Sequence, residues 1–537
     1  MGGPALAPGA RYASTTSIDL AEGWSVERLT PPSRLFGANG LRTGPDGRIY
    51  VAQVSGSTIS ALDTDTGDIE TISAKGGDII APDDLAFDPA GNLYATEYYD
   101  GRVSVRGADG STRLLRDDLP GANGITVFQG RLFVNECRVG GRLMELPLDG
   151  GAPRVLVDNL PLPNAMEVGP DGWLYYPVMG TNDIWRINPE GGEPERVVGD
   201  LGVPDSVKFD PQGNIVSTQA HTGQVLRIDP RTGDRRVLAN LTPGLDNCTF
   251  IGDRLFVSNF TGEITEIQAD GETRTTLPGG LSWPLDLTVG PDGVLYVADG
   301  THFYALRSGS LETLGMLFSA NYPGPIRGVT AIGADEFLVT TAAGTVAVYR
   351  PAKEETEVLA EGIDQPYGIV TGSDGRIAVT EFGAAGRVLL LRGGQVETLA
   401  SGLNSPVGVA FGPDDTVLVA ESGAGRVVSI SGSTVDTLVD GLQTPHGLLV
   451  RDGQLLIADA GLKALISVDL GTKTRQTLAA NLPVGAPPGV TAKPLLGVQP
   501  FSGPQGPFTG LTAGPDGTVY LSADAEGSVL ALTQITR

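Results

Sequence analysis

The sequence predicts an all-β protein made of two tandem six-bladed β-propellers, with twelve four-stranded blades. A turn rich in Gly and Asp, first seen at Gly44-Pro45-Asp46-Gly47, recurs twelve times in 537 residues with a period near forty. Each period holds four strand-sized runs of Val, Ile, Leu, Tyr and Thr, and none sustains a helical apolar stripe. Because one four-stranded sheet cannot bury both its faces alone, such repeats stack as the blades of a propeller.

The first period shows how each blade is built. Residues 40–43 predict an innermost strand, 48–53 a second strand, 57–62 a third and 68–72 an outer fourth. Asp and Gly lie between these runs, where the backbone must reverse. The later periods repeat this order up to a Pro- and Gly-rich insertion at residues 481–508.

Twelve blades exceed the usual size of one ring, so we expect two domains, residues 1–270 and 271–537. Residues 25–29 resemble an isolated fourth strand, and the chain ends on a third strand at 528–532. If each ring is closed by a strand from its own beginning, the boundary falls between Gln268 and Thr273. The alternative is that the first strand closes the last blade, across both rings.

Composition limits the class of protein and its partners. With 76 Gly, 38 Pro and 40% hydrophobic residues, the chain has many turns and a sizeable core. The net charge of −26 argues against nucleic acid or an anionic membrane as partner, and we expect a small-molecule substrate. Cys137 and Cys248 form no disulfide framework or zinc motif, and no signal peptide is visible, so a cytoplasmic protein is expected. The oligomeric state stays open.

The first residue of each innermost strand, called the slot here, differs between the rings. All six slots of the first ring hold Asn or Asp, and another Asn follows the last one. They are Asn39, Asp83, Asn123, Asn164, Asp205 and Asp246, with Asn247 beside the last. In the second ring the slots hold Leu285, Arg327, Tyr367, Val407, His446 and Thr509.

Six strands converge on one axis, so the oxygens of the first ring must crowd together. Hard divalent cations take carboxylate and carboxamide oxygens, and calcium is the expected ion. The alternative is that these Asn and Asp residues only cap the loops before the strands, as they do in many turns.

The pieces Ala38-Asn39-Gly40-Leu41, Ala122-Asn123-Gly124-Ile125 and Leu245-Asp246-Asn247-Cys248 resemble inner-strand motifs of the gluconolactonase, senescence-marker (SMP-30) and paraoxonase group. Blade segments such as Leu295-Tyr296-Val297-Ala298-Asp299 are similar to NHL repeats. The resemblance implies a calcium ion on the axis of the first propeller and hydrolysis of a lactone or ester. The resemblance to the propeller class covers almost the whole chain, whereas the resemblance in the metal ring covers only blades one to six.

By this resemblance, Asn123, Asp205, Asp246 and Asn247 match the metal ligands best, and Asn39, Asp83 and Asn164 complete the wall. The group commonly has Glu at the first slot, where this chain has Asn39.

A cation would polarise the carbonyl and activate a water, and a neighbouring carboxylate would take its proton. Asp205 or Asp246 is the expected base, and His221 is the one histidine near this face. The second strands of the first ring end in polar residues that we expect at the mouth of the channel, in contact with substrate. These are Glu97, Glu136, Gln219 and Asn259. A purely structural role is the alternative for each.

The second ring suggests different chemistry. Arg327, Tyr367 and His446 share the inner slot and are candidates to bind an anionic substrate or to act as acid and base. The insertion at 481–508 is expected either to cover this channel or to pack on the first ring.

Three functions therefore compete. The first is a calcium-dependent hydrolase working in the first ring. The second is a lyase or cyclase working in the second ring, resembling the streptogramin B lyase or strictosidine synthase groups. The third is a binding scaffold without catalysis, as in many NHL propellers.

Overall fold

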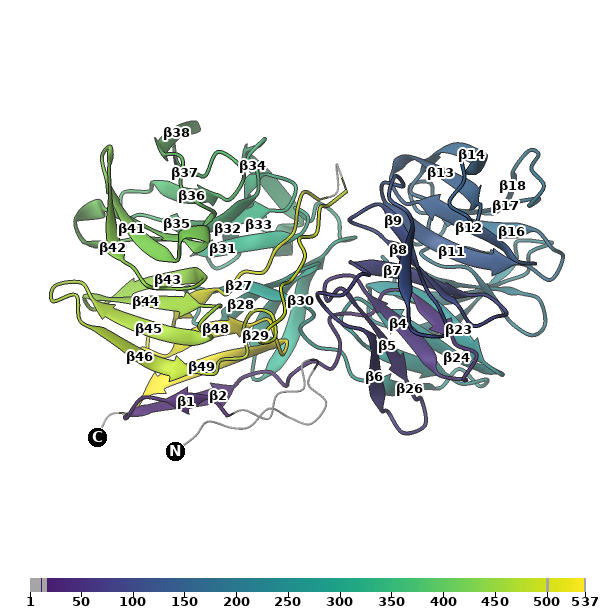
Figure 1. Cartoon of the computed structure of the whole chain (residues 1–537), viewed down its shortest axis with the longest axis horizontal. Helices are drawn as coiled ribbons and strands as arrows, with labels where there is room; N and C mark the ends of the chain where they lie inside the picture. The colour runs from purple at the N-terminus through teal and green to yellow at the C-terminus, as the bar shows by residue number, and fades with distance from the viewer. Residues whose placement is uncertain (1–10, 12–16, 499–501, 536–537) are drawn as a thin grey trace. The chain divides into compact units, whose positions relative to one another are not determined.

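The computed structural model describes Arg11, residues 17–498 and residues 502–535 (Figure 1). These residues form twelve antiparallel sheets, eleven of four strands and one of five. Helix is confined to three short 3-10 turns in the described chain, η1 (Pro351–Lys353), η2 (Pro413–Asp415) and η3 (Ser422–Ala424). The predicted all-β fold of two tandem six-bladed propellers is confirmed.

The chain divides into two compact units. One, the N-terminal propeller, comprises Leu35–Gly279 and Gly489–Gln499, and the other, the C-terminal propeller, comprises the remaining residues. The six blades of the N-terminal propeller are β3 (Leu41–Thr43), β4 (Ile49–Gln53), β5 (Thr58–Leu62), β6 (Ile69–Ser73); β7 (Pro82–Phe87), β8 (Leu93–Glu97), β9 (Arg102–Arg106), β10 (Thr112–Arg116); β11 (Ala122–Phe128), β12 (Arg131–Glu136), β13 (Val139–Leu146), β14 (Arg154–Pro161); β15 (Glu167–Val168), β16 (Leu174–Val178), β17 (Asp183–Ile187), β18 (Glu195–Val198); β19 (Lys208–Phe209), β20 (Ile215–Thr218), β21 (Gln224–Ile228), β22 (Arg235–Asn240); and β23 (Leu245–Ile251), β24 (Arg254–Asn259), β25 (Ile264–Ile267), β26 (Thr273–Leu277).

The C-terminal propeller uses strands from both ends of the chain. Its blades are β27 (Pro284–Val289), β28 (Leu295–Asp299), β29 (His302–Arg307), β30 (Ser310–Met316); β31 (Ile326–Gly333), β32 (Glu336–Thr341), β33 (Val346–Arg350), β34 (Glu355–Ala360); β35 (Pro366–Thr371), β36 (Ile377–Glu381), β37 (Arg387–Arg392), β38 (Gln395–Ala400); β39 (Pro406–Phe411), β40 (Val417–Glu421), β41 (Arg426–Ser431), β42 (Thr434–Val439); β43 (Pro445–Arg451), β44 (Gln454–Asp459), β45 (Ala464–Asp469), β46 (Arg475–Ala480), β1 (Asp19–Leu20); and β47 (Leu511–Ala513), β48 (Val519–Ala523), β49 (Ser528–Gln534), β2 (Trp24–Arg28).

The domain boundaries 1–270 and 271–537 need correction. Strand β2 pairs antiparallel with β49, from Trp24 opposite Gln534 to Arg28 opposite Leu530 (Figure 1). The sixth blade has its own fourth strand, β26, whereas the three C-terminal strands β47, β48 and β49 lack one, and β2 supplies it. The first strand thus closes the last blade, and residues 35–279 are inserted in sequence between a closing strand and the ring that it closes.

In each ring, a serine on the second strand of the last blade bonds to the first blade and closes the ring. The Ser258 hydroxyl donates to the carbonyl of Asn39 at 2.7 Å, joining the sixth blade to the first. The Ser522 hydroxyl donates to the carbonyl of Leu285 at 2.6 Å, joining the twelfth to the seventh. Each set of six blades is therefore closed into its own ring.

The apolar core lies between neighbouring blades. In one such cluster, Val103 and Val105 of β9 pack with Leu132 and Val134 of β12 in the next blade. Second strands are buried along their length, whereas fourth strands such as β38 face outward and are largely exposed. This gradient from axis to rim is what stacked, twisted sheets produce, because each inner strand contacts sheets on both sides.

The insertion at 481–508 contributes residues to both units. One part packs on the N-terminal propeller and another part lies at the channel of the C-terminal propeller, so each expected location applies to one part. Residues 489–499 belong to the N-terminal propeller, where the Lys493 ammonium donates to the carbonyl of Gly77 at 2.6 Å. Residues 502–508 belong to the C-terminal propeller, where the Gly503 N–H donates to the carbonyl of Ala342 at 2.7 Å.

Candidate functional site

The slots of the N-terminal propeller lie where the inner strands lose regular pairing. The register of β7 with β8 shifts between Pro82 and Leu85, and β11 and β23 shift at the matching places. A bulge leaves two residues opposite one, which turns both side chains away from the regular alternation. Two adjacent positions per strand, such as Asp83 and Asp84, are thereby freed from the ladder.

The structure brings the predicted acidic residues together. The Asn39 amide donates to Asp246 Oδ2 at 2.9 Å. Asp83, Asp205 and Asp246 are at most 9% exposed. The negative charges of Asp83 and Asp205 act on one another and on Asp246, so the three carboxylates share one electrostatic environment.

This environment disfavours ionisation. Burial raises the pKa of Asp83 to about 8, with repulsion from Asp84 as a further cause. Burial, and then repulsion from the neighbouring aspartates, holds the pKa values of Asp205 and Asp246 well above their usual range. Three buried carboxylates that repel one another form a site that a positive ion would stabilise.

Two oxygens in this cluster lack a hydrogen-bond partner although they are buried. They are Asn123 Oδ1 and Asp205 Oδ1. An unsatisfied buried acceptor costs free energy, and an oxygen-binding cation would satisfy both. Among the described residues, no three His, Cys, Asp or Glu side chains form a metal site by themselves. The chemistry of the donor set nevertheless suits a hard cation, because Asp83, Asp205, Asp246 and Asn123 all offer oxygen atoms.

The other predicted ligands have bonds of their own. The Ala165 N–H donates to Asn164 Oδ1 at 2.7 Å, and the Cys248 N–H donates to Asn247 Oδ1 at 2.8 Å. The Val54 N–H donates to Asn39 Oδ1 at 3.1 Å. The oxygens of these three amides therefore hold backbone in place. The amino groups of Asn39 and Asn247 donate to the carboxylates of Asp246 and Asp84. The amino group of Asn164 donates to the sulfur of Met179.

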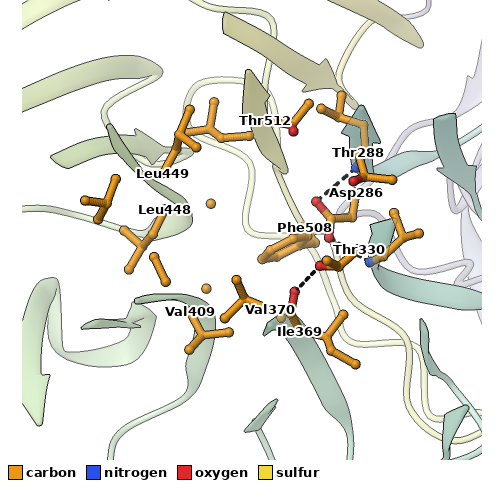
Figure 2. A pocket seen from close by; sticks show the side chains of 18 of the residues that line it. Asp286, Thr288, Thr330, Ile369, Val370, Val409, Leu448, Leu449, Phe508 and Thr512 are labelled. Carbon is orange, nitrogen blue, oxygen red and sulfur yellow. Dashed lines mark hydrogen bonds between the residues drawn. The ribbon is translucent and has the colours of Figure 1, made fainter. Parts of the chain in front are cut away.

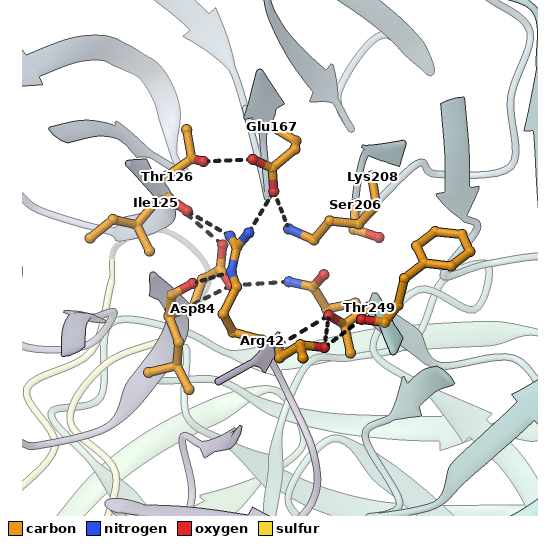
Figure 3. Close-up of polar contacts among 12 residues, drawn as sticks. Arg42, Asp84, Ile125, Thr126, Glu167, Ser206, Lys208 and Thr249 are labelled. Atoms are coloured by element: carbon orange, nitrogen blue, oxygen red, sulfur yellow. Dashed lines mark hydrogen bonds and ion pairs between the residues drawn. The ribbon is translucent and has the colours of Figure 1, made fainter. Parts of the chain in front are cut away.

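A charged layer next to the slots escaped the sequence analysis (Figure 3). Arg42 donates to Glu167 Oε2 at 2.5 Å and to the carbonyls of Leu85 at 2.7 Å and Ile125 at 3.1 Å. Lys208 lies 3.5 Å from the same Glu167 oxygen. Burial alone would raise the pKa of Glu167, but Arg42 and Lys208 outweigh it and lower that pKa to about 2.

We call this network of Arg42, Glu167 and Lys208 the charged floor. Each of its members lies three positions after a slot, so the alignment that revealed the slots also contained this signal.

The polar ends of the second strands are structural. Glu97 Oε2 accepts the N–H of Ile80 at 2.6 Å, and Gln219 Oε1 accepts the N–H of Gly202 at 2.9 Å, each seventeen residues earlier. Asn259 donates to the carbonyls of Thr242 and Pro243. Each side chain ties the loop before the inner strand to its own blade and is at most 5% exposed.

Glu136 differs in its partners and not in its burial. It is fully buried, and the guanidinium of Arg142 donates to it at 2.9 Å, with Arg138 at 3.1 Å. The predicted contacts of Glu97, Glu136, Gln219 and Asn259 with substrate are thus replaced by structural bonds. His221 is exposed in the turn between β20 and β21.

In the C-terminal propeller, the chain itself covers the predicted trio. Arg327 is fully buried, donates to the carbonyl of Pro504, and stacks over the ring of Tyr367 at 4.7 Å. Phe508 lies between Tyr367 and His446, at 6.1 and 6.0 Å from their rings. Residues 502–508 therefore close this end of the channel, and the trio holds that segment in place.

Comparisons with known proteins identify a family match for the N-terminal half of the chain. Residues 16–261, less than half of the chain, match the family described as the SMP-30/Gluconolactonase/LRE-like region. This confirms the resemblance for the N-terminal half. A comparison with curated proteins gave no match. Among the described residues, no helix has the length and apolar character needed to cross a membrane.

Solved propeller structures are also similar to parts of the chain. A streptogramin B lyase is 19% identical and covers 52% of this chain and 97% of its own, with a TM-score of 0.38. Virginiamycin B lyase from Staphylococcus aureus is 16% identical over 51% and 96%, with a TM-score of 0.38. The extracellular domain of BT4673 from B. thetaiotaomicron is 10% identical over 95% and 83%, with a TM-score of 0.33.

Proposed function

We propose that the N-terminal propeller, whose sequence matches the SMP-30/gluconolactonase-like region, is a metal-dependent hydrolase of a lactone or ester. The observation that carries the proposal is the buried cluster of Asp83, Asp205 and Asp246, in which Asp205 Oδ1 and Asn123 Oδ1 lack partners. Asp83, Asn123, Asp205 and Asp246 would hold the metal, with calcium as the expected ion. When bound, such an ion polarises a carbonyl and stabilises the oxyanion that forms on it.

The chain's own residues can move the proton that hydrolysis requires. While one carboxylate oxygen of Asp205 would hold the cation, its other oxygen accepts a proton from the attacking water as the water oxygen bonds to the carbonyl carbon. The carbon–oxygen bond of the ester or lactone then breaks, and the same proton passes to the departing alkoxide. Asp246 is the less suitable base, because Asn39 already donates to its Oδ2.

The surrounding residues orient this machinery. Asn39 fixes the carboxylate of Asp246 through a hydrogen bond to its Oδ2. The charged floor keeps Arg42 and Lys208 paired with Glu167, so neither cation is free to neutralise the cluster. Within residues 489–498, Lys493 donates to the carbonyl of Gly77 and the Leu496 N–H donates to Asp100 at 3.4 Å, which ties this segment to loops of the N-terminal propeller.

The decisive experiment measures metal binding and hydrolysis separately. Calorimetric titration with calcium after chelation should show one site, and the Asp205→Asn variant should lose it. With gluconolactone and phenyl acetate as probes, kcat/KM should fall about 10²–10⁴-fold in Asp205→Asn and on chelation. Asp436→Asn, an exposed carboxylate of the C-terminal propeller, is the matched control.

Two results would count against this proposal. Calcium binding that survives in Asp205→Asn would place the ion elsewhere. Hydrolysis indifferent to both chelator and variant would exclude this cluster as the active site. A protein that neither binds calcium nor hydrolyses these probes would be a binding scaffold. The lyase or cyclase alternative is disfavoured because residues 502–508 cover Arg327, Tyr367 and His446.

A further inference from the structure

The axis of the C-terminal propeller holds a cavity of about 290 Å³ (Figure 2). Aliphatic side chains from several inner strands line it, among them Ile369, Val409 and Leu448. Asp286 is the single charged residue among its lining residues. A dry cavity of about 150 Å³ accommodates benzene, so this one has room for an aromatic ring with attached groups.

The cavity is a well that is closed at one end. Phe508 lies at the end where the inner strands begin, and the first residues of those strands are buried. Exposure rises toward the other ends of the strands, at Thr371, Phe411 and Val450. A ligand would therefore enter from the strand ends and meet Asp286 and Phe508 at the bottom.

Asp286 has a counterpart in the N-terminal propeller. Asp84 accepts the N–H of Leu85 at 2.8 Å and that of Ile125 in the next blade at 3.2 Å. Asp286 accepts the N–H of Leu287 at 2.9 Å and that of Val329 in the next blade at 2.9 Å. The two carboxylates thus occupy the same place in two equivalent frameworks.

Their surroundings differ in charge. In the N-terminal propeller, Asn247 donates to Asp84 at 3.1 Å, and the positive charge of Arg42 acts on Asp84 from the preceding blade. In the C-terminal propeller, the corresponding positions are Gly447 and Thr512, which both line the cavity. No basic side chain lines the cavity, and burial raises the pKa of Asp286 to about 7.

The same alignment explains the cavity itself. Glu167 and Lys208 of the charged floor correspond to Val370 and Ala410, which line the well. Replacing Arg, Glu and Lys by Thr, Val and Ala removes long side chains from one level of the axis. The cavity is the space that the charged floor fills in the other ring.

We propose that this well binds a small organic cation, in which an amidinium, guanidinium or ammonium group pairs with Asp286 and an apolar body contacts Val370, Ala410 and Leu449. The cationic group would take the place that Arg42 has in the N-terminal propeller. There Arg42 donates to the carbonyls of Leu85 and Ile125, whose counterparts Leu287 and Val329 line the well. Val370 stands where the N-terminal propeller has Glu167, so Asp286 is the one carboxylate left among the lining residues at this level. A ligand with a single positive charge would therefore balance it.

The test uses benzamidine as the probe, with benzoate and benzyl alcohol as anionic and neutral matches of similar size. Calorimetry or ligand-observed NMR on the full chain should show that benzamidine binds in the millimolar range or tighter. It should bind at least tenfold more tightly than either match. Equal binding of all three probes, or no binding of benzamidine, would overturn the proposal.

Two variants locate the site. Asp286→Asn should weaken benzamidine binding at least tenfold. Thr512→Arg should abolish it, because the new guanidinium fills the well as Arg42 does in the other ring. Thr434→Arg, on an exposed outer strand, is the matched control and should bind normally. If Asp286→Asn does not fold, Thr512→Arg decides alone, and full binding by Thr512→Arg would overturn the proposal. This site is independent of calcium and of Asp205, so the two proposals can fail separately.

Discussion

Three positions after the slot, the N-terminal propeller carries Arg42, Glu167 and Lys208, whereas the C-terminal propeller carries Thr512, Val370 and Ala410 at the corresponding places. The backbone frameworks are equivalent, as the matching bonds of Asp84 and Asp286 show. In the N-terminal propeller, the acidic slots lie next to the charged floor. In the C-terminal propeller, residues 502–508 cover the slots, and an apolar well replaces the floor. The same backbone framework therefore carries different chemistry on the two axes.

The largest expected effect comes from a variant that breaks the charged floor. Arg42→Thr gives the N-terminal propeller the residue that its neighbour has and leaves Glu167 with Lys208 alone, 3.5 Å away. Removing one partner of a buried ion pair costs about 3–5 kcal/mol. Because this pair is partly exposed and Glu167 keeps Lys208, the free energy of unfolding of the N-terminal propeller in urea should fall by at most this amount. Arg48→Thr, which removes an exposed arginine paired with Asp46 and Glu70, should cost less than about 1 kcal/mol. Equal costs for the two variants would show that the floor is not a stabilising network.

A second variant tests which ring the first strand closes. Arg28 of β2 pairs with Glu526 at 2.8 Å, and the Glu526 side chain is 2% exposed. Arg28→Ala should destabilise the C-terminal propeller by about 2 kcal/mol, because a buried carboxylate loses its partner. Hydrogen exchange should quicken in β49 and stay unchanged in β26. The double variant Arg28→Ala/Glu526→Gln should recover part of the loss, and faster exchange in β26 would contradict the topology.

The smallest effect is a pH dependence confined to the C-terminal propeller. Burial lowers the pKa of His446 to about 4, and the Thr509 N–H donates to its Nδ1 at 3.2 Å. The unfolded chain takes up the proton first as pH falls. The stability from this group is therefore complete above about pH 6.5 and is lost as pH falls toward 4.

Between about pH 6.5 and 5.5 the expected loss of unfolding free energy from this group is about 1 kcal/mol. The difference in Tm between wild type and His446→Gln, measured across this interval, isolates the effect, because His302 titrates in both proteins. Parallel pH profiles for the two proteins would show that folding does not lower the pKa of His446.

Much of the candidate site could be predicted from the sequence repeat of about forty residues. Aligning the repeats identified the six slots, and the structure confirms that Asp83, Asp205 and Asp246 are buried together. The same alignment read three residues further would have found Arg42, Glu167 and Lys208. The structural role of Glu97 and Gln219 was less accessible, because their partners lie seventeen residues earlier in loops without a motif.

The sequence by itself determined the fold, the blade count and the residues that face each axis, because strand alternation and turn chemistry are local properties that repeat with the period. Only the tertiary structure decided where β2 pairs, since an unpaired strand edge accepts any strand of suitable pattern, and the free edge was beside β49 and not in the sixth blade. It also decided that residues 502–508 close one channel end and that a well remains beyond Phe508. Whether space is left empty depends on the summed volume of side chains from six strands that meet only in the folded ring.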